Sequence, residues 1–223
     1  MGILNKGFAI AIDGPSGVGK STVAKLLAKQ LNITYIDTGA MYRAVALYNI
    51  RNNSSHAVEK SLEKINIELS IQNSEQRIFL NGEDVTTLIR TQEVSDATSR
   101  VVAVNETVRK KLVELQQQMA KKNAVVMDGR DIGSQVLPNA QVKIYLDAAP
   151  EIRAKRRALE MQGKGQPHDF VQILQEIHER DERDKNRLIS PLVQTPDAIY
   201  LDTVDLTPAE VAQKIADIVK ERV

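Results

Sequence analysis

The stretch GPSGVGKS at residues 14–21 decides the fold of this chain. It satisfies the pattern G-x-x-x-x-G-K-[ST] in full, with an apolar run (8–13) before it and a helical pattern (23–31) after it. Glycines in such a loop permit close approach and backbone angles that a Cβ would forbid, so backbone N–H groups can point inward at a phosphate. This order of strand, loop and helix predicts a nucleoside-triphosphate site, and the alternative is a glycine-rich turn without a ligand.

Two side chains of this loop carry the expected chemistry. Lys20 is expected to bridge the β- and γ-phosphates, and the Ser21 hydroxyl is expected to ligate Mg²⁺. The residues expected to hold the triphosphate are Gly14, Pro15, Ser16, Gly17, Val18, Gly19, Lys20, Ser21 and Thr22.

Length and composition bound the class of protein. The chain has 223 residues, no cysteine, 26% charged residues and a formal net charge of +1. That length suits one α/β domain, residues 1–223, with insertions. The lack of cysteine excludes disulfides and thiolate chemistry, and the charge balance does not favour a nucleic-acid or membrane partner. No apolar run approaches the ~20 residues of a membrane span, so we expect a soluble, cytoplasmic protein.

Short apolar runs alternate with helical patterns along the chain, which predicts an α/β fold with a parallel five-stranded sheet flanked by helices, of the P-loop NTPase type. Each run ends in Asp, near the edge where open α/β sheets bind their ligands. The expected strands are FAIAID (8–13), ITYID (33–37), AVVMD (124–128), VKIYLD (142–147) and AIYLD (198–202).

Two of the intervening helices can be outlined from the sequence. The helix after the loop is expected to bury Val23, Leu26, Leu27 and Leu31 on one face. The last helix opens with TPAE, in which Thr207 and Glu210 form a capping box around Pro208.

Residues 65–94 break this rhythm, because INIELSIQ (65–72) and QRIFLNGEDV (76–85) alternate apolar and polar residues. Period-two alternation predicts half-exposed antiparallel strands, and Asn81-Gly82 is a turn signal. We interpret the stretch as a small antiparallel insertion on the core.

The class of triphosphate protein follows from what accompanies the loop. The chain lacks the N-K-x-D and D-x-x-G motifs of a GTPase and leaves little room for the added domains of a motor ATPase. A small phosphotransferase remains, and it needs cations around both substrates' phosphates and a lid that excludes water.

Two clusters follow expected strands. DTGAMYR (37–43) offers Thr38, Tyr42 and Arg43, or is only a helix start with an exposed arginine. DGRD (128–131) places Arg130 and Asp131 at the ligand edge of the sheet.

Two further clusters lie on expected helices. RAKRR (153–157), with GKG (163–165), suits a hinged lid or a solvated basic face. ERDERDKNR (179–187) places Arg180, Asp184 and Arg187 on one face, above the apolar residues Phe170, Ile173, Leu174 and Ile177. Its alternative is surface ion pairing, as between Asp181 and Lys185. The histidines, His56, His168 and His178, lack metal spacing and are expected at the surface.

The segments TGAMYR, IRTQEV, DGRDIG and RDERDKNR occur together, and with them the chain resembles the bacterial cytidylate kinases of the nucleoside-monophosphate kinase superfamily. The resemblance runs essentially end to end. It implies transfer of the γ-phosphoryl group of ATP to CMP or dCMP with Mg²⁺, by a monomer. It also implies an inserted CMP-binding region at about 38–103 and a lid at about 153–167.

The resemblance also implies roles for single residues. Thr38 and Arg43 would meet the CMP phosphate with Arg130 close by, and Tyr42 would belong to the same site. Ser99, Arg109 and Asp131 would surround the cytosine. Arg180, Asp184 and Arg187 would reach the phosphate and sugar, while Arg153 and Arg157 would cover ATP. Lys20, Arg130, Arg157 and Arg180 are the expected catalytic residues. The stretch between Ser99 and Arg109 is one residue longer than the family pattern.

The base chemistry supports this assignment, because a carboxylate such as Asp131 and a cation such as Arg109 complement the N4 donor and the N3 and O2 acceptors of cytosine. Two other readings stay open at this point. One is a related P-loop kinase with another nucleotide or a metabolite as acceptor, and the other is a regulatory or binding module that holds a triphosphate.

Overall fold

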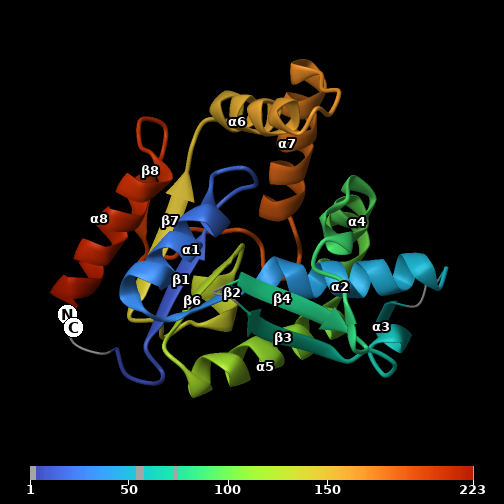
Figure 1. Ribbon diagram of the computed structural model, residues 1–223, viewed down its shortest axis with the longest axis horizontal. Helices are drawn as coiled ribbons and strands as arrows, with labels where there is room; N and C mark the ends of the chain where they lie inside the picture. Colours follow the sequence, from blue (N-terminus) through green and yellow to red (C-terminus); the bar gives the residue numbers. More distant parts are fainter. Residues whose placement is uncertain (1–3, 54–57, 73–74, 223) are drawn as a thin grey trace.

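A parallel sheet of five strands forms the centre of the molecule, with the strand order β2-β6-β1-β7-β8 (Figure 1). The structure is a computed structural model that describes residues 4–53, 58–72 and 75–222. All five expected strands are confirmed, each beginning within one residue of its expected start. They are β1 (Ala9–Asp13), β2 (Thr34–Asp37), β6 (Val125–Gly129), β7 (Val142–Asp147) and β8 (Ile199–Asp202).

Helices cover both faces of this sheet. Along β1, Ile10 and Ile12 enter one core with α1 (Lys20–Leu31) and α8 (Pro208–Glu221). Ala9 and Ala11 enter the opposite core, which includes residues of α5 (Glu106–Lys122) and of a π turn (Ile132–Val136). Because successive side chains of a strand point to opposite faces, a strand buried on both sides reads as a continuous apolar run.

Helix α1 differs from expectation at one position. Leu26 is 39% exposed, whereas Val23, Leu27 and Leu31 are buried. At 100° per residue, Leu26 lies roughly 130° from the middle of the buried stripe, where the small side chains of Ala24 and Ala28 pack instead. At α8 the expected capping box is present: Thr207 Oγ1 accepts from Glu210 N, and Glu210 Oε2 accepts from Thr207 N.

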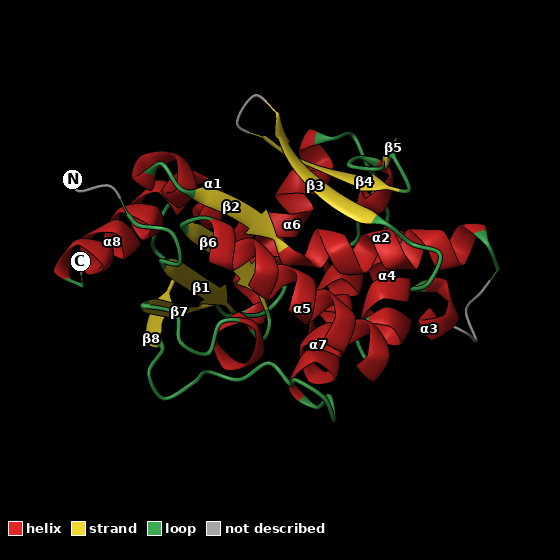
Figure 2. Ribbon diagram, turned by 90° about the horizontal axis from the view of Figure 1, so that it is seen from below, coloured by secondary structure: helices red, strands yellow, loops and turns green. Residues whose placement is uncertain are grey.

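The expected antiparallel insertion is a three-stranded sheet of β3 (Ile67–Gln72), β4 (Glu75–Leu80) and β5 (Glu83–Asp84). Asn81 and Gly82 connect β4 to β5 with φ angles of 51° and 84°, the left-handed values that a tight hairpin turn requires. Buried Ile78 and Leu80 join a separate core with α2 (Thr38–Arg51). Figure 2 shows this small sheet lying over α2, apart from the parallel sheet.

Short elements complete the insertion around α2. They are α3 (Val58–Ser61), a 3₁₀ turn (Leu88–Arg90), α4 (Gln92–Ala97) and a π turn (Thr98–Val102).

Helices α6 (Pro150–Gly163) and α7 (Phe170–Lys185) form a hairpin above the ends of the parallel strands (Figure 1). Ala154, Ile173 and Ile177 make its small core. Phe170, expected in the apolar stripe, is 37% exposed because it is the first residue of the helix. In the ranges that the structure describes, no helix is long and apolar enough to cross a membrane.

Candidate active site

A cleft of about 1250 Å³ lies between the carboxyl ends of the parallel strands, the α6–α7 hairpin and the insertion. Among the described residues that line it, ten are Lys or Arg and seven are Asp or Glu. The chain as a whole carries a net charge of only +1, so positive charge is concentrated here. Such a concentration favours ligands that carry several negative charges.

Residues 16–21 of the phosphate loop form one wall of the cleft, and helix α1 begins at Lys20. Gly14 has a φ of 147°, and a Cβ on it would lie 2.1 Å from the carbonyl oxygen of Leu146. No larger residue fits there without moving the backbone. The Lys20 ammonium donates to Pro15 O at 2.6 Å, and burial, together with the nearby Arg130, lowers its pKa well below the usual value. A buried cation held this way gains most from a phosphate ligand.

Asp128, at the end of β6, is a functional candidate that the sequence analysis did not select. Its Oδ2 accepts from Ser21 Oγ at 2.8 Å, and its Oδ1 accepts from the Tyr35 hydroxyl at 2.9 Å. Burial, with Asp37 nearby, raises its pKa. The sequence signal that could have selected Asp128 is its position at the end of an apolar run. The structure adds that this strand, β6, pairs with β1, the strand before the phosphate loop.

Ser21 and Asp128 supply hydroxyl and carboxylate oxygens, the donors that Mg²⁺ prefers, so the residues fit this ion. Within the described ranges, no group of three or more His, Asp or Glu side chains could hold a metal. A Mg²⁺ ion here would therefore depend on substrate phosphates and water for its remaining ligands, as is usual for this ion.

The start of α2 brings Thr38 and Arg43 to the cleft. Asp37 caps this helix by accepting from Ala40 N at 3.0 Å, and it pairs with Arg90 at 2.7 Å. Burial lowers the pKa of Arg43, and the neighbouring Arg90 adds to this effect. Arg90 also lines the cleft and is another residue that the sequence analysis missed.

Residues from β6 and α7 meet in the middle of the cleft. Arg130 Nε and Asp184 Oδ2 form an ion pair at 2.7 Å. Helix α7 ends at Lys185, before Arg187, yet Arg180, Asp184 and Arg187 all line the cleft. Among the described groups, Arg180 Nε and two guanidinium nitrogens of Arg187 are buried without a hydrogen-bond partner. Burial, together with Arg130, lowers the pKa of Arg180 to about 10.

Arg109, Asp131, Tyr42 and Ser99 form the far end of the cleft. Arg109 and Asp131 make a buried ion pair, and the Arg109 guanidinium lies 5.4 Å from the centre of the Tyr42 ring. Ser99 lies in the π turn Thr98–Val102, where Ala103 N donates to Thr98 O at 2.8 Å. Ser99 and Arg109 thus both line this cleft, as expected from the resemblance.

The basic cluster at the start of α6 divides into separate environments. Arg153 is 2% exposed, and its guanidinium pairs with Asp181 and donates to Ser16 O and Ala148 O. The expected surface pair of Asp181 with Lys185 is therefore wrong, because Asp181 is buried against Arg153. Arg157 lies in the cleft, where it donates to Gln92 Oε1 of the insertion at 2.7 Å.

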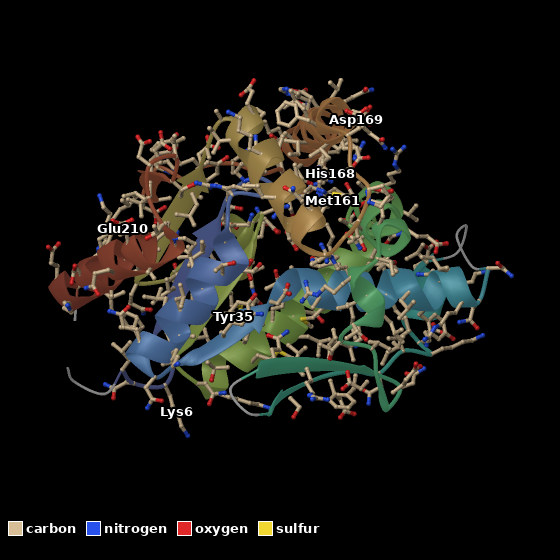
Figure 3. All side chains as sticks on the ribbon, turned by 45° about the horizontal axis from the view of Figure 1, so that its top comes forward. Lys6, Tyr35, Met161, His168, Asp169 and Glu210 are labelled. Carbon is tan, nitrogen blue, oxygen red and sulfur yellow. The ribbon has the colours of Figure 1, made fainter. Side chains whose placement is uncertain are left out.

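The histidines take no part in a metal cluster among the described residues. His168 is exposed at the outer end of the cleft, His178 is exposed on α7, and His56 lies outside the described residues. Figure 3 shows Met161 and His168 together on the α6–α7 hairpin, well away from Tyr35 on β2 of the parallel sheet. The cleft therefore extends from the phosphate loop to the hairpin turn.

A phosphate-binding loop at the edge of a parallel sheet, facing a cation-rich cleft under a helical hairpin, defines a P-loop kinase. The fold is also similar to the crystal structure of an uncharacterized protein from Eubacterium ventriosum (TM-score 0.52, 15% identity), with 97% of this chain and 100% of that one covered.

Comparison with known sequences identifies the family. The cytidylate kinase profile matches residues 10–221. A cytidylate kinase of Caldicellulosiruptor bescii is 50% identical over 213 residues, covering 94% of each chain. One of Lactobacillus gasseri is 47% identical over 223 residues, covering 98% of this chain and 96% of that one. The chain belongs to the cytidylate kinase family.

Proposed function

We propose that the protein transfers the γ-phosphoryl group of ATP to CMP or dCMP, giving ADP and CDP or dCDP. The observation that carries this proposal is the buried Arg109–Asp131 pair, which lies in the same cleft as the phosphate loop. The pair offers an acceptor and donors that complement the edge of cytosine. Uracil presents a carbonyl where cytosine has its amino group, so the same carboxylate would disfavour UMP.

On the donor side, backbone N–H groups of residues 14–22 would hold the phosphates of ATP, and Lys20 would reach its β- and γ-phosphates. Ser21 and Asp128 would hold Mg²⁺, which when bound neutralises charge on those phosphates. Arg157 would contact the transferring group from the lid. Arg153 would act indirectly, since its guanidinium supports the carbonyl of Ser16 within the loop.

On the acceptor side, Thr38 and Arg43 would bind the phosphate of CMP, and Arg187 would reach its phosphate and sugar. Asp184 would accept from a ribose hydroxyl while paired with Arg130. Arg130 and Arg180 would then lie between the two substrates, beside Lys20, whose pKa both arginines lower. Charge that develops on the migrating phosphoryl group would meet fixed cations, so in-line transfer needs positioning and charge neutralisation rather than a covalent intermediate.

Water would compete with CMP as acceptor, so transfer also requires a lid. The hairpin segment at about 153–167 would supply it, against an inserted CMP-binding region at about 38–103. Arg157 on the lid already contacts Gln92 of that region at 2.7 Å. We propose that one domain of 1–223, acting as a monomer in the cytoplasm, contains the whole site.

The test is ADP release from ATP and Mg²⁺, with CMP, dCMP, UMP, AMP, GMP or no acceptor added in turn. Strong release with CMP and dCMP, weak release with UMP and little without an acceptor is the expected result. A preference for another nucleotide or a metabolite as acceptor would leave the proposed kinase activity intact but would overturn the assignment of a cytosine-binding site. Release that does not depend on an acceptor would overturn the phosphotransferase itself.

A further inference from the structure

Asp13 is a buried carboxylate that none of the steps above uses. It is the last residue of β1, directly before Gly14, and it is 6% exposed. Its Oδ1 accepts from Ile132 N at 2.8 Å, and its Oδ2 accepts from Gly133 N at 2.7 Å. Among the described residues it forms no ion pair, so these two backbone groups are its main partners.

Both of these backbone groups lie at the start of the π turn Ile132–Val136, immediately after Asp131. The first N–H groups of a helical turn have no partner within the turn, and a carboxylate that accepts two of them fixes where the turn begins. Because Asp131 directly precedes this turn, the position of the turn also fixes the backbone of Asp131, whose side chain pairs with Arg109.

Gly133 shows how closely the turn is held. A Cβ at this position would lie 3.3 Å from Asp13 Oδ2 and 3.2 Å from Lys143 Cδ. Both distances are tighter than most real Cβ contacts, so an added methyl group would displace a neighbouring atom by a few tenths of an ångström. The backbone of the turn therefore lies close against the Asp13 carboxylate.

We infer that Asp13 is a positioning residue for base selection: it holds the Asp131 segment in register with the phosphate loop that begins at the next residue, Gly14. The backbone of Asp13 leads directly into the phosphate loop and so positions that loop. Its side chain holds the π turn and so positions the carboxylate of Asp131. The inference rests on the proposed function, because it assumes that Asp131 reads the base. It makes selectivity for cytosine depend on a residue outside the cleft.

The experiment compares Asp13→Asn with wild type and with Asp147→Asn. Asparagine keeps the shape of Asp13 and one acceptor, but its NH₂ group must face one of the two N–H donors, Ile132 N or Gly133 N. Asp147 is the matched control, since it also ends a strand of the same sheet, next to β1. Within the described part of the chain, its carboxylate accepts a hydrogen bond from Ala148 N alone, at 2.9 Å. The readouts are kcat/KM for CMP and for UMP, KM for ATP, and the Kd of CMP measured by calorimetry without ATP.

For Asp13→Asn we expect the ratio of kcat/KM for CMP to that for UMP to fall about 10- to 100-fold, with weaker CMP binding and a KM for ATP within about twofold of wild type. Asp147→Asn should keep the wild-type ratio. A purely structural role of Asp13 would lower kcat/KM for CMP and for UMP by the same factor. An unchanged CMP-to-UMP ratio in folded Asp13→Asn would therefore overturn the inference.

If Asp13→Asn does not fold, Gly133→Ala perturbs the same contact from the other side and should lower the same ratio to a smaller extent. An unchanged ratio in that variant would then overturn the inference. If wild type itself does not prefer CMP to UMP, the proposed function fails instead, and the two failures are thereby distinguished.

Discussion

The ion pair of Arg153 with Asp181 leads to a prediction that connects stability with the phosphate loop. Both residues are buried, at 2% and 6% exposure, and the pair joins α6 to α7. Arg153 also donates to Ser16 O at 3.0 Å and to Ala148 O at 2.8 Å. Asp181→Asn would leave the guanidinium buried without a counter-charge while changing the shape of the site very little.

The magnitude follows from the burial of the pair. Removing one partner of a buried ion pair costs about 3–5 kcal/mol, because the remaining charge cannot be solvated. For a protein of this size, each kcal/mol lowers the melting temperature by about 2–4 °C, so we expect a decrease of roughly 6–20 °C. The lost restraint on Ser16 should also raise KM for ATP more than KM for CMP.

The assay is denaturant and thermal unfolding of Asp181→Asn, combined with steady-state kinetics. Glu160→Gln is the matched control, since Glu160 of α6 pairs with Lys164, the residue after this helix, and both side chains are more than half exposed. Exposed pairs contribute about 0–1 kcal/mol, so this variant should unfold close to wild type. A loss below about 1 kcal/mol in Asp181→Asn, with an unchanged KM for ATP, would refute the reasoning.

Three further predictions follow from single positions. Lys20→Ala should lower kcat about 10²- to 10³-fold with an unchanged circular dichroism spectrum, and normal turnover would contradict its role. Gly14→Ala should cost at least about 2 kcal/mol in chemical denaturation, because its Cβ would lie 2.1 Å from Leu146 O, and a wild-type midpoint would contradict this close approach. Burial raises the pKa of Asp13 from 3.8 to about 6, against the opposing backbone N–H groups, with Asp131 raising it and Lys20 lowering it. Between pH 3.8 and about pH 6 the folded state therefore binds a proton at Asp13 more tightly than the unfolded state does, so acid should stabilise the fold through this group. The same proton removes one of the carboxylate oxygens that accept from the turn. We therefore expect kcat/KM for CMP of wild type, divided by that of Asp13→Asn, to decrease as the pH is lowered past about 6. Because both proteins use the same substrate, this ratio cancels the titration of the CMP phosphate. A ratio that does not change with pH would contradict the prediction.

Much of the fold could be predicted because its signals are local in the chain. The phosphate loop, the five strands and the capping box of α8 each depend on residues within a few positions of one another. The Asn81-Gly82 turn could be predicted for the same reason, since Asn and Gly are the residue types that most readily adopt the left-handed backbone angles found there. The exposure of Leu26 could not be predicted in the same way, because packing against the sheet decided which side of α1 faces inward.

Candidate site residues could be selected from the sequence where a motif carries its own chemistry, as at Lys20 and Ser21. The sequence by itself determined that a phosphate loop would start a parallel sheet and that cations would gather near its edge. Only the tertiary structure decided their partners: Asp128 meets Ser21 across 107 positions of the chain, and Asp13 meets Gly133 across 120. Charged side chains such as Arg153 suit either solvent or a buried partner, and the local sequence is the same in both cases. The order of the strands settles that choice, because it determines which strand ends become neighbours and therefore which charges are buried together.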